Sequence, residues 1–164
     1  MKIFKVLFLD IDGVLNSDDY FNNREDSDNR PYPLSEFDPK AVIKINKVLE
    51  KCDLLVMSSD WRFQTNLKNI LIEVGIDKNK VNSVILTPYL GHVFKDNLRG
   101  HEIDFVIKNL KRTYKKVNYV IIDDLLEFMP FQKVHLVHTY FKTGITDNDV
   151  NKAIEILEDT GLYV

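Results

Sequence analysis

The chain has 164 residues and a mass of 19.2 kDa, a length typical of a single domain. Hydrophobic residues make up 45% of it and charged residues 29%, which excludes a disordered or collagen-like protein. A net charge of −3 excludes a surface so basic that it would bind nucleic acid or anionic membranes through charge alone.

Apolar runs typical of buried parallel strands alternate along the chain with apolar residues at helical spacing. In chain order we predict a strand at residues 4–9, a long loop at 16–38, a helix at 41–49, a strand at 54–57, a helix at 67–74, a strand at 84–86, a helix at 103–110, strands at 119–122 and 134–137, and a helix at 150–157. This order predicts an α/β fold: a Rossmann-like, doubly wound, mainly five-stranded parallel sheet whose ligands bind beyond the carboxyl ends of the strands.

Residues that favour helix ends agree with these elements. Asp38 followed by Pro39 is typical of a helix start, and Thr146 with Asp149 three residues later forms a capping box. The glycines expected at helix C-termini are Gly75 and Gly161.

The segment at residues 16–38 lacks helical periodicity and is rich in Asp, Asn and Pro. We predict a loop or small flap, because unstructured segments of this length in a compact domain are usually functional or disordered. Residues 16–38 and 87–98 are the only segments outside the predicted strands and helices that are long enough to be insertions, and neither is long enough for a full cap domain. We therefore expect one domain over residues 1–164 with no large cap domain. The edge of the sheet that holds the site is then open.

Other features favour a reduced compartment and no membrane contact. Cys52 is the single cysteine, so it cannot form an internal disulfide, and we expect it to be structural. The first apolar run is followed directly by Asp10 and Asp12 and not by the small-residue cleavage site of a signal peptide. None of the apolar runs approaches the roughly 20 residues of a membrane span. We therefore expect a cytoplasmic protein. The basic run at residues 108–116 is predicted to be a solvated helix end far from the site.

Polar residues follow several strands at the points where ligands are expected. Asp10 and Asp12 end the first strand, and two residues apart in an extended chain they face the same way. Ser58 and Ser59 follow the second strand. The other groups at this edge are Asp123 and Asp124, after the fourth strand, and Arg99, before a helix. Close carboxylates repel unless a cation or a shared proton intervenes, so their convergence points to a metal or phosphate site.

These motifs resemble those of the haloacid dehalogenase-like (HAD) hydrolases, in the same order and on the same elements. Within that superfamily the chain resembles the small phosphatase domains of the Swiss Army knife RNA repair group. The similar stretches begin at Asp10, Ser58, Arg99, Asp123 and Gly144. Arg99 is a departure, since lysine is commoner there in that family, and Lys95 is the alternative.

The resemblance implies covalent phosphoryl transfer. Asp10 would be the nucleophile and Asp12 the general acid and base, while Ser58 and Arg99 would hold the phosphoryl oxygens. Mg²⁺ would be bound by Asp10, the backbone carbonyl of Asp12, Asp123 and Asp124. The residues expected to bind substrate are Gly13, Ser59 and Arg62. The scattered histidines lack zinc-site spacing and are left out of the metal site.

Two neighbours of this site allow more than one interpretation. Trp61 is either a core residue or a platform for substrate, and Arg62 reaches a second phosphate, holds Asp124 or forms a surface ion pair. The open edge and the resemblance favour a phosphorylated RNA or DNA end, or a nucleotide, as substrate. The alternatives are a small-metabolite phosphatase of the same mechanism, and a non-catalytic phosphoacceptor or phosphate-binding regulatory module.

Overall fold

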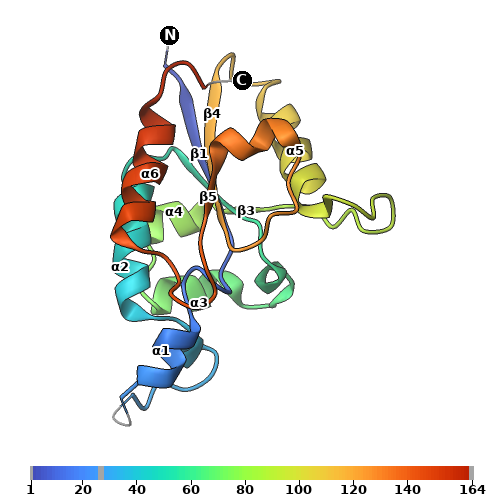
Figure 1. The fold of residues 1–164 in the computed structure, drawn as a ribbon. Helices are drawn as coiled ribbons and strands as arrows, with labels where there is room; N and C mark the ends of the chain where they lie inside the picture. The colour runs from blue at the N-terminus through green and yellow to red at the C-terminus, as the bar shows by residue number, and fades with distance from the viewer. Residues whose placement is uncertain (1, 26–27, 163–164) are drawn as a thin grey trace.

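The structure, a computed structural model, describes residues 2–25 and 28–162. Its centre is a parallel five-stranded sheet with the strand order β3-β2-β1-β4-β5, as the α/β prediction requires (Figure 1). The strands are β1 (Phe4–Leu9), β2 (Leu54–Met57), β3 (Ile85–Leu86), β4 (Val117–Asp123) and β5 (Leu136–His138). β1 is central and pairs with β2 on one side and β4 on the other.

Helices cover both faces of this sheet (Figure 1). They are α1 (Asp18–Asn23), α2 (Pro39–Leu49), α3 (Leu67–Glu73), α4 (Lys78–Asn82), α5 (Leu98–Leu110) and α6 (Asp147–Glu158), with 3₁₀ turns η1 (Leu34–Glu36), η2 (Asp60–Phe63) and η3 (Pro130–His135). Alternate residues of β1 face opposite ways: Leu7 and Leu9 pack with α2, α3 and α6, whereas Val6 and Phe8 pack with α5. Both faces are therefore buried, which explains the nearly continuous apolar runs.

The predicted helix ends are confirmed with one exception. The Asp38 side chain accepts from the Lys40 amide before α2, and Thr146 and Asp149 form the capping box of α6. Gly75 follows α3 with a φ of 100°, the left-handed conformation expected beyond a helix end. The prediction for Gly161 is wrong, because α6 already ends at Glu158 and the next residue is extended.

Several boundaries differ from prediction for physical reasons. The helix predicted from residue 103 begins at Leu98. The prediction missed its start because the first turn is largely polar and shows no apolar periodicity. Residues 134 and 135 belong to η3 and not to the last strand. The segment expected to lack helix contains α1 and η1, and α4 was missed because five residues are too short to show a period.

The described residues contain no separate cap domain, and α1 with η1 forms only a small projection at the lower end of the molecule in Figure 1. None of the helices in the described ranges is long and apolar enough to cross a membrane.

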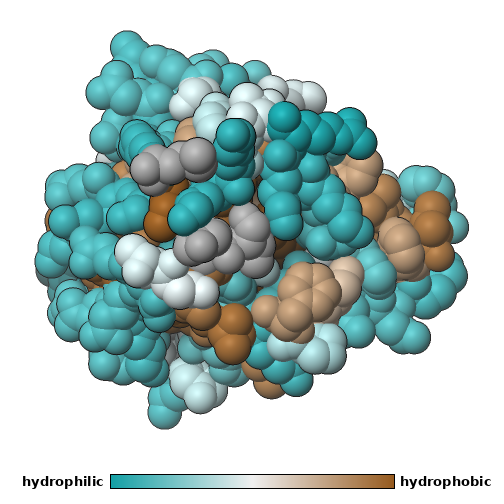
Figure 2. All heavy atoms as spheres, turned by 90° about the horizontal axis from the view of Figure 1, so that it is seen from above, coloured by the Kyte–Doolittle hydropathy of each residue, from teal (hydrophilic) through white to brown (hydrophobic). Residues whose placement is uncertain are grey.

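The basic run lies at the end of the sheet away from the acidic motifs, as predicted. Lys111, Arg112 and Lys115 are exposed beyond α5, just before β4 starts beside Phe4. Figure 2 looks onto this end of the molecule, where most of the visible surface is hydrophilic. Hydrophobic residues are visible there on the projection at the right, which corresponds to the loop between β3 and α5 in Figure 1, and in smaller groups toward the centre of the view.

Candidate active site

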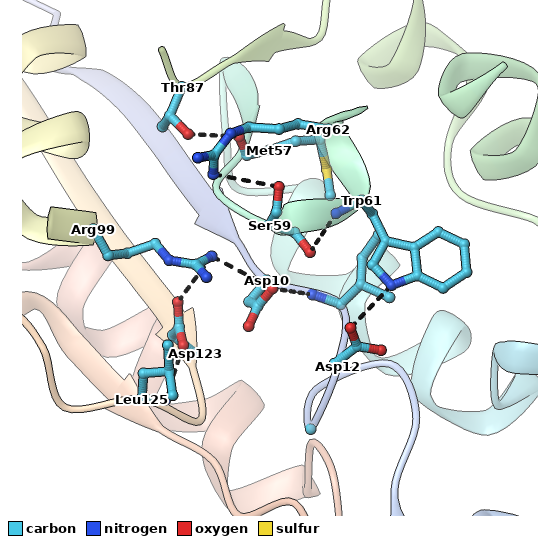
Figure 3. A network of polar contacts seen from close by, with 12 residues as sticks. Asp10, Asp12, Met57, Ser59, Trp61, Arg62, Thr87, Arg99, Asp123 and Leu125 are labelled. Atoms are coloured by element: carbon cyan, nitrogen blue, oxygen red, sulfur yellow. Dashed lines mark hydrogen bonds and ion pairs between the residues drawn. The ribbon is translucent and has the colours of Figure 1, made fainter. Parts of the chain in front are cut away.

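The carboxyl ends of β1, β2 and β4 bring the polar motifs together (Figure 3). The amide of Asp10 donates to the Ile122 carbonyl of β4 at 3.0 Å, and the amide of Ser58 donates to the Leu9 carbonyl of β1 at 2.9 Å. Asp123 is the last residue of β4. The parallel register thus places an acid, a hydroxyl and a second acid side by side at one edge, where the sequence predicted them.

Three carboxyl groups form a compact cluster at this edge. Asp10, Asp123 and Asp124 each offer an oxygen within 4.8 Å of the others. Asp10 is 5% exposed and Asp123 fully buried, while Asp124 is partly exposed. Burial raises the pKa of all three, and for Asp123 burial together with the nearby charge of Asp10 raises the pKa to about 8. The folded chain thus holds carboxylates together at an energetic cost that a bound cation would offset.

Arg99, in the first turn of α5, faces the acid cluster. Its Nη1 lies 3.5 Å from Asp10 Oδ1 and 3.7 Å from Asp123 Oδ2, and its side chain is 11% exposed (Figure 3). Lys95, the alternative cation, is exposed on the loop before α5. The structure therefore favours Arg99 as the cation of this site.

Unsatisfied polar atoms indicate that this edge is built for a ligand. Within the part of the chain that the structure describes, Ser58 Oγ, Arg99 Nη1 and Asp123 Oδ2 are buried without a hydrogen-bond partner. Such atoms usually cost stability, so their convergence on one edge needs a reason. An anionic oxygen would satisfy the hydroxyl and the guanidinium, and a cation would satisfy the carboxylate. The all-oxygen set of Asp10, Asp123 and Asp124 fits Mg²⁺, a hard cation.

The Asp12 side chain lies outside that cluster and is exposed. Its Oδ1 accepts from Asn16 Nδ2 at 2.9 Å, and its Oδ2 accepts from Trp61 Nε1 at 3.0 Å (Figure 3). Trp61 also packs edge-on against Phe37. Trp61 is partly buried and packs against the hydrophobic core, one of the two roles considered from the sequence, and its indole N–H also holds the Asp12 carboxylate.

Gly13 is required by the backbone and by crowding. Its φ is 71°, and a Cβ at this position would overlap the carboxyl group of Asp124. Its amide donates to Asn16 Oδ1 at 2.9 Å and its carbonyl accepts from Thr139 Oγ1 at 2.8 Å. The sequence-based expectation of a substrate contact at Gly13 therefore does not extend to its own amide, which already has a partner.

Arg62 has a different partner from those expected. Its Nη2 lies 3.1 Å from Glu102 Oε1, and the two side chains are 4% and 1% exposed. Its Nη1 donates to the Ser59 carbonyl at 3.4 Å. Arg62 thus forms a buried ion pair and not the surface pair considered from the sequence, while its Nε is buried without a hydrogen-bond partner. That Arg62 also binds substrate stays a prediction.

Ser59, also expected to contact substrate, is fully buried. Its hydroxyl accepts from the Trp61 amide at 3.3 Å and hydrogen-bonds to Asp10, which opposes the rise in the Asp10 pKa. This geometry gives Ser59 a positioning role beside the nucleophile candidate.

Four residues that contact the site were given no role in it from the sequence, although two of them, Asn16 and Glu102, lie in stretches that resemble the family. Asn16 and Thr139 hold the loop around Gly13, Glu102 pairs with Arg62, and His138 Nε2 lies 2.9 Å from the Asp124 carbonyl. A side-chain amide four residues after Asp12 was the available signal for Asn16.

Histidine and cysteine side chains that were not assigned to the site pack against other parts of the fold. His135 is buried and stacks on Tyr119, and His101 stacks on Phe94. Cys52 is buried, and burial raises the pKa of its thiol to about 12, as expected of a structural cysteine.

Comparison with known proteins supports the resemblance to HAD domains that the sequence motifs indicated. No curated protein and no solved structure matches the chain. A family model described as the HAD domain in Swiss Army Knife RNA repair proteins matches residues 6–150, a span that includes Asp10, Ser58, Arg99 and Asp123. Because this match covers most of the sequence, including β2 to β5 and all but the first two residues of β1, the chain belongs to this family of HAD domains.

Proposed function

We propose that the protein is a Mg²⁺-dependent phosphatase that hydrolyses phosphate monoesters through an aspartyl-phosphate on Asp10. The observation that carries the proposal is the convergence of three buried, unsatisfied polar atoms, on Ser58, Arg99 and Asp123, beside the Asp10 carboxylate. A hydroxyl, a guanidinium and an acid cluster are the groups that phosphoryl transfer needs.

In this mechanism Asp10 attacks phosphorus and the bond to the leaving oxygen breaks, while Asp12 donates a proton to that oxygen. Asp12 then takes a proton from the water that hydrolyses the aspartyl-phosphate, which releases phosphate and restores both residues. Ser58 and Arg99 hold the phosphoryl oxygens throughout. Mg²⁺, bound by Asp10, the Asp12 carbonyl, Asp123 and Asp124, would neutralise charge on the transferring group.

The proposed substrate is a terminal phosphate on a nucleic acid end, or a nucleotide. The family occurs in RNA repair proteins, and the described residues include no cap domain that would enclose a small metabolite. The position of Asp12, held by Trp61 and Asn16 beside the nucleophile, favours an enzyme over a phosphoacceptor module, because a mere acceptor needs no general acid.

The test is phosphate release, with and without Mg²⁺, from an aryl phosphate and from RNA and DNA oligonucleotides phosphorylated at the 3′ or the 5′ end. We expect metal-dependent release by the wild type and none by Asp10→Asn. Release from small metabolites alone would replace the nucleic acid substrate with the metabolite alternative. No release by folded protein, together with a stable phosphate on Asp10, would identify a phosphoacceptor module instead.

A further inference from the structure

We propose that Phe63 and Tyr89 form a stacking platform for the base of the nucleotide that carries the terminal phosphate. The inference rests on the proposed function for the phosphate end of the ligand and adds a second binding site beside it. It assigns the substrate to single-stranded ends, whose terminal base is free to leave its neighbours and stack on protein.

The two aromatic rings are exposed and in mutual contact. Phe63 is 62% exposed and Tyr89 is 55% exposed, and their ring centroids lie 6.1 Å apart in an edge-to-face arrangement. The exposed ring of His92 lies 6.5 Å beyond Tyr89. Exposed aromatic rings in contact with one another form an apolar surface on which a flat ligand can stack.

A buried ion pair fixes this platform to the protein. Arg62 Cζ lies 4.8 Å from the centre of the Phe63 ring, so the guanidinium covers one side of the ring and leaves the other to solvent. Glu102 Oε1 accepts from Arg62 and also from the Leu90 amide, both at 3.1 Å. One carboxylate therefore joins the turn of Phe63 to the loop of Tyr89. Burying an ion pair costs desolvation free energy, and this pair holds in place the two segments that carry the exposed rings.

The platform lies at the same edge of the sheet as the phosphate site. Phe63 ends the η2 turn that Ser59 caps, and Ser59 hydrogen-bonds to Asp10. Four residues of 3₁₀ helix span about 8 Å, which is comparable to the distance from a terminal phosphate to its base. Thr87, two residues before Tyr89, hydrogen-bonds through its amide to Met57, the last residue of β2. A nucleotide with its phosphate at Arg99 could thus reach the rings.

A nucleobase suits these surroundings better than a protein partner. The occupant must carry a phosphate for the unsatisfied atoms of Ser58 and Arg99, and must present a flat face to the rings. Every base has a π-face, so stacking is tolerant of sequence. The charged residues that follow on the Tyr89 loop, Lys95 and Asp96, are of opposite sign, so the platform has no basic track for a long polyanion. We expect contact with one or two terminal nucleotides and a shallow dependence of affinity on salt.

The test is binding of short, labelled, 5′- or 3′-phosphorylated oligonucleotides, measured by fluorescence anisotropy without divalent cations so that hydrolysis does not intervene. The variants are Phe63→Leu and Tyr89→Leu. Tyr114→Leu is the matched control, because Tyr114 is a 37% exposed aromatic residue between α5 and β4, at the opposite end of the sheet from the site. We expect each platform variant to raise Kd about tenfold and the control to leave it unchanged.

Replacing the terminal nucleotide by an abasic one tests the same contact without altering the protein. It should weaken binding by wild type about tenfold, and weaken binding by the platform variants much less. Blunt duplex ends should bind less tightly than single strands. Equal Kd values for wild type and both variants, or an equal loss on the abasic end in all proteins, would overturn the platform.

Hydrolysis of glycerol phosphate, which has no ring to stack, separates this inference from the proposed function. Its kcat/KM should be the same in Phe63→Leu, Tyr89→Leu and wild type. If no substrate is hydrolysed while ring-dependent binding persists, the proposed function fails and the platform stands. If hydrolysis is normal and the Kd of Phe63→Leu and Tyr89→Leu equals that of wild type, the platform is refuted and the proposed function is not.

Discussion

At the scale of single residues, Asp12 is distinguished from the other acids of the site by its partners. Its two carboxylate oxygens accept from Asn16 and Trp61, whereas Asp10 and Asp123 lie together with Arg99. A proton donor to the leaving group has to stand beside the nucleophile without joining the metal ligands. The two N–H donors supply that separation.

We therefore expect Asp12→Asn to lower kcat by about 10²–10⁴-fold on an alkyl phosphate or an oligonucleotide, whose leaving oxygen needs a proton. The loss should be smaller on an aryl phosphate with an acidic leaving group. Initial rates on both substrates provide the measurement, with a thermal melt to verify folding. An equal loss on both would contradict the acid role.

At the scale of elements, the N-terminal part of α5 serves two purposes. Arg99 and Glu102, three residues apart, lie on one side of the helix, where Arg99 faces the acid cluster and Glu102 pairs with Arg62. Both purposes depend on polar residues. The same polarity hid the turn from prediction by hydrophobic periodicity.

Glu102→Ala should lower the free energy of unfolding by about 3–5 kcal/mol, because it leaves the Arg62 guanidinium buried without its partner. Glu102→Gln retains an acceptor for Arg62 and the Leu90 amide and should cost less. Urea denaturation of the three proteins measures both differences. A loss below about 1 kcal/mol for Glu102→Ala would show that the pair does not brace these loops.

At the scale of the whole molecule, the parallel sheet forces acids from β1 and β4 together, and this couples stability to pH. The pKa of Asp123 is raised from an ordinary 3.8 to about 8 by burial and by Asp10. The folded state therefore holds a proton that the unfolded chain has lost between about pH 4 and pH 8. Without metal, this group makes the protein less stable as the pH rises through that window.

Mg²⁺ should reverse this trend, since it binds the ionised carboxylates and competes with the proton. We expect Mg²⁺ to raise the melting temperature more at pH 8 than at pH 6, with a gain of about 2.7 kcal/mol at one hundred times its Kd. Asp123→Asn should abolish most of the gain and flatten the metal-free pH dependence. Thermal melts with Mg²⁺ or EDTA test this, and an equal shift in Asp123→Asn would contradict it.

The sequence by itself determined the succession of strands and helices along the chain, the class of fold and the acids at the strand ends. Each of these depends on local spacing: apolar runs mark β1 and β4, and Asp10 and Asp123 follow them directly. The parallel arrangement then requires the carboxyl ends to meet. The family match over residues 6–150 agrees with that inference.

Only the tertiary structure decided which neighbours those residues acquired. Glu102 reaches Arg62 across 40 positions, Trp61 reaches Asp12 across 49, and Thr139 reaches Gly13 across 126. No local pattern encodes such contacts, because they depend on how the turns after different strands pack against one another. Sequence could therefore predict which polar groups meet at the carboxyl ends of the strands, whereas the residues that position them became visible only in the folded chain.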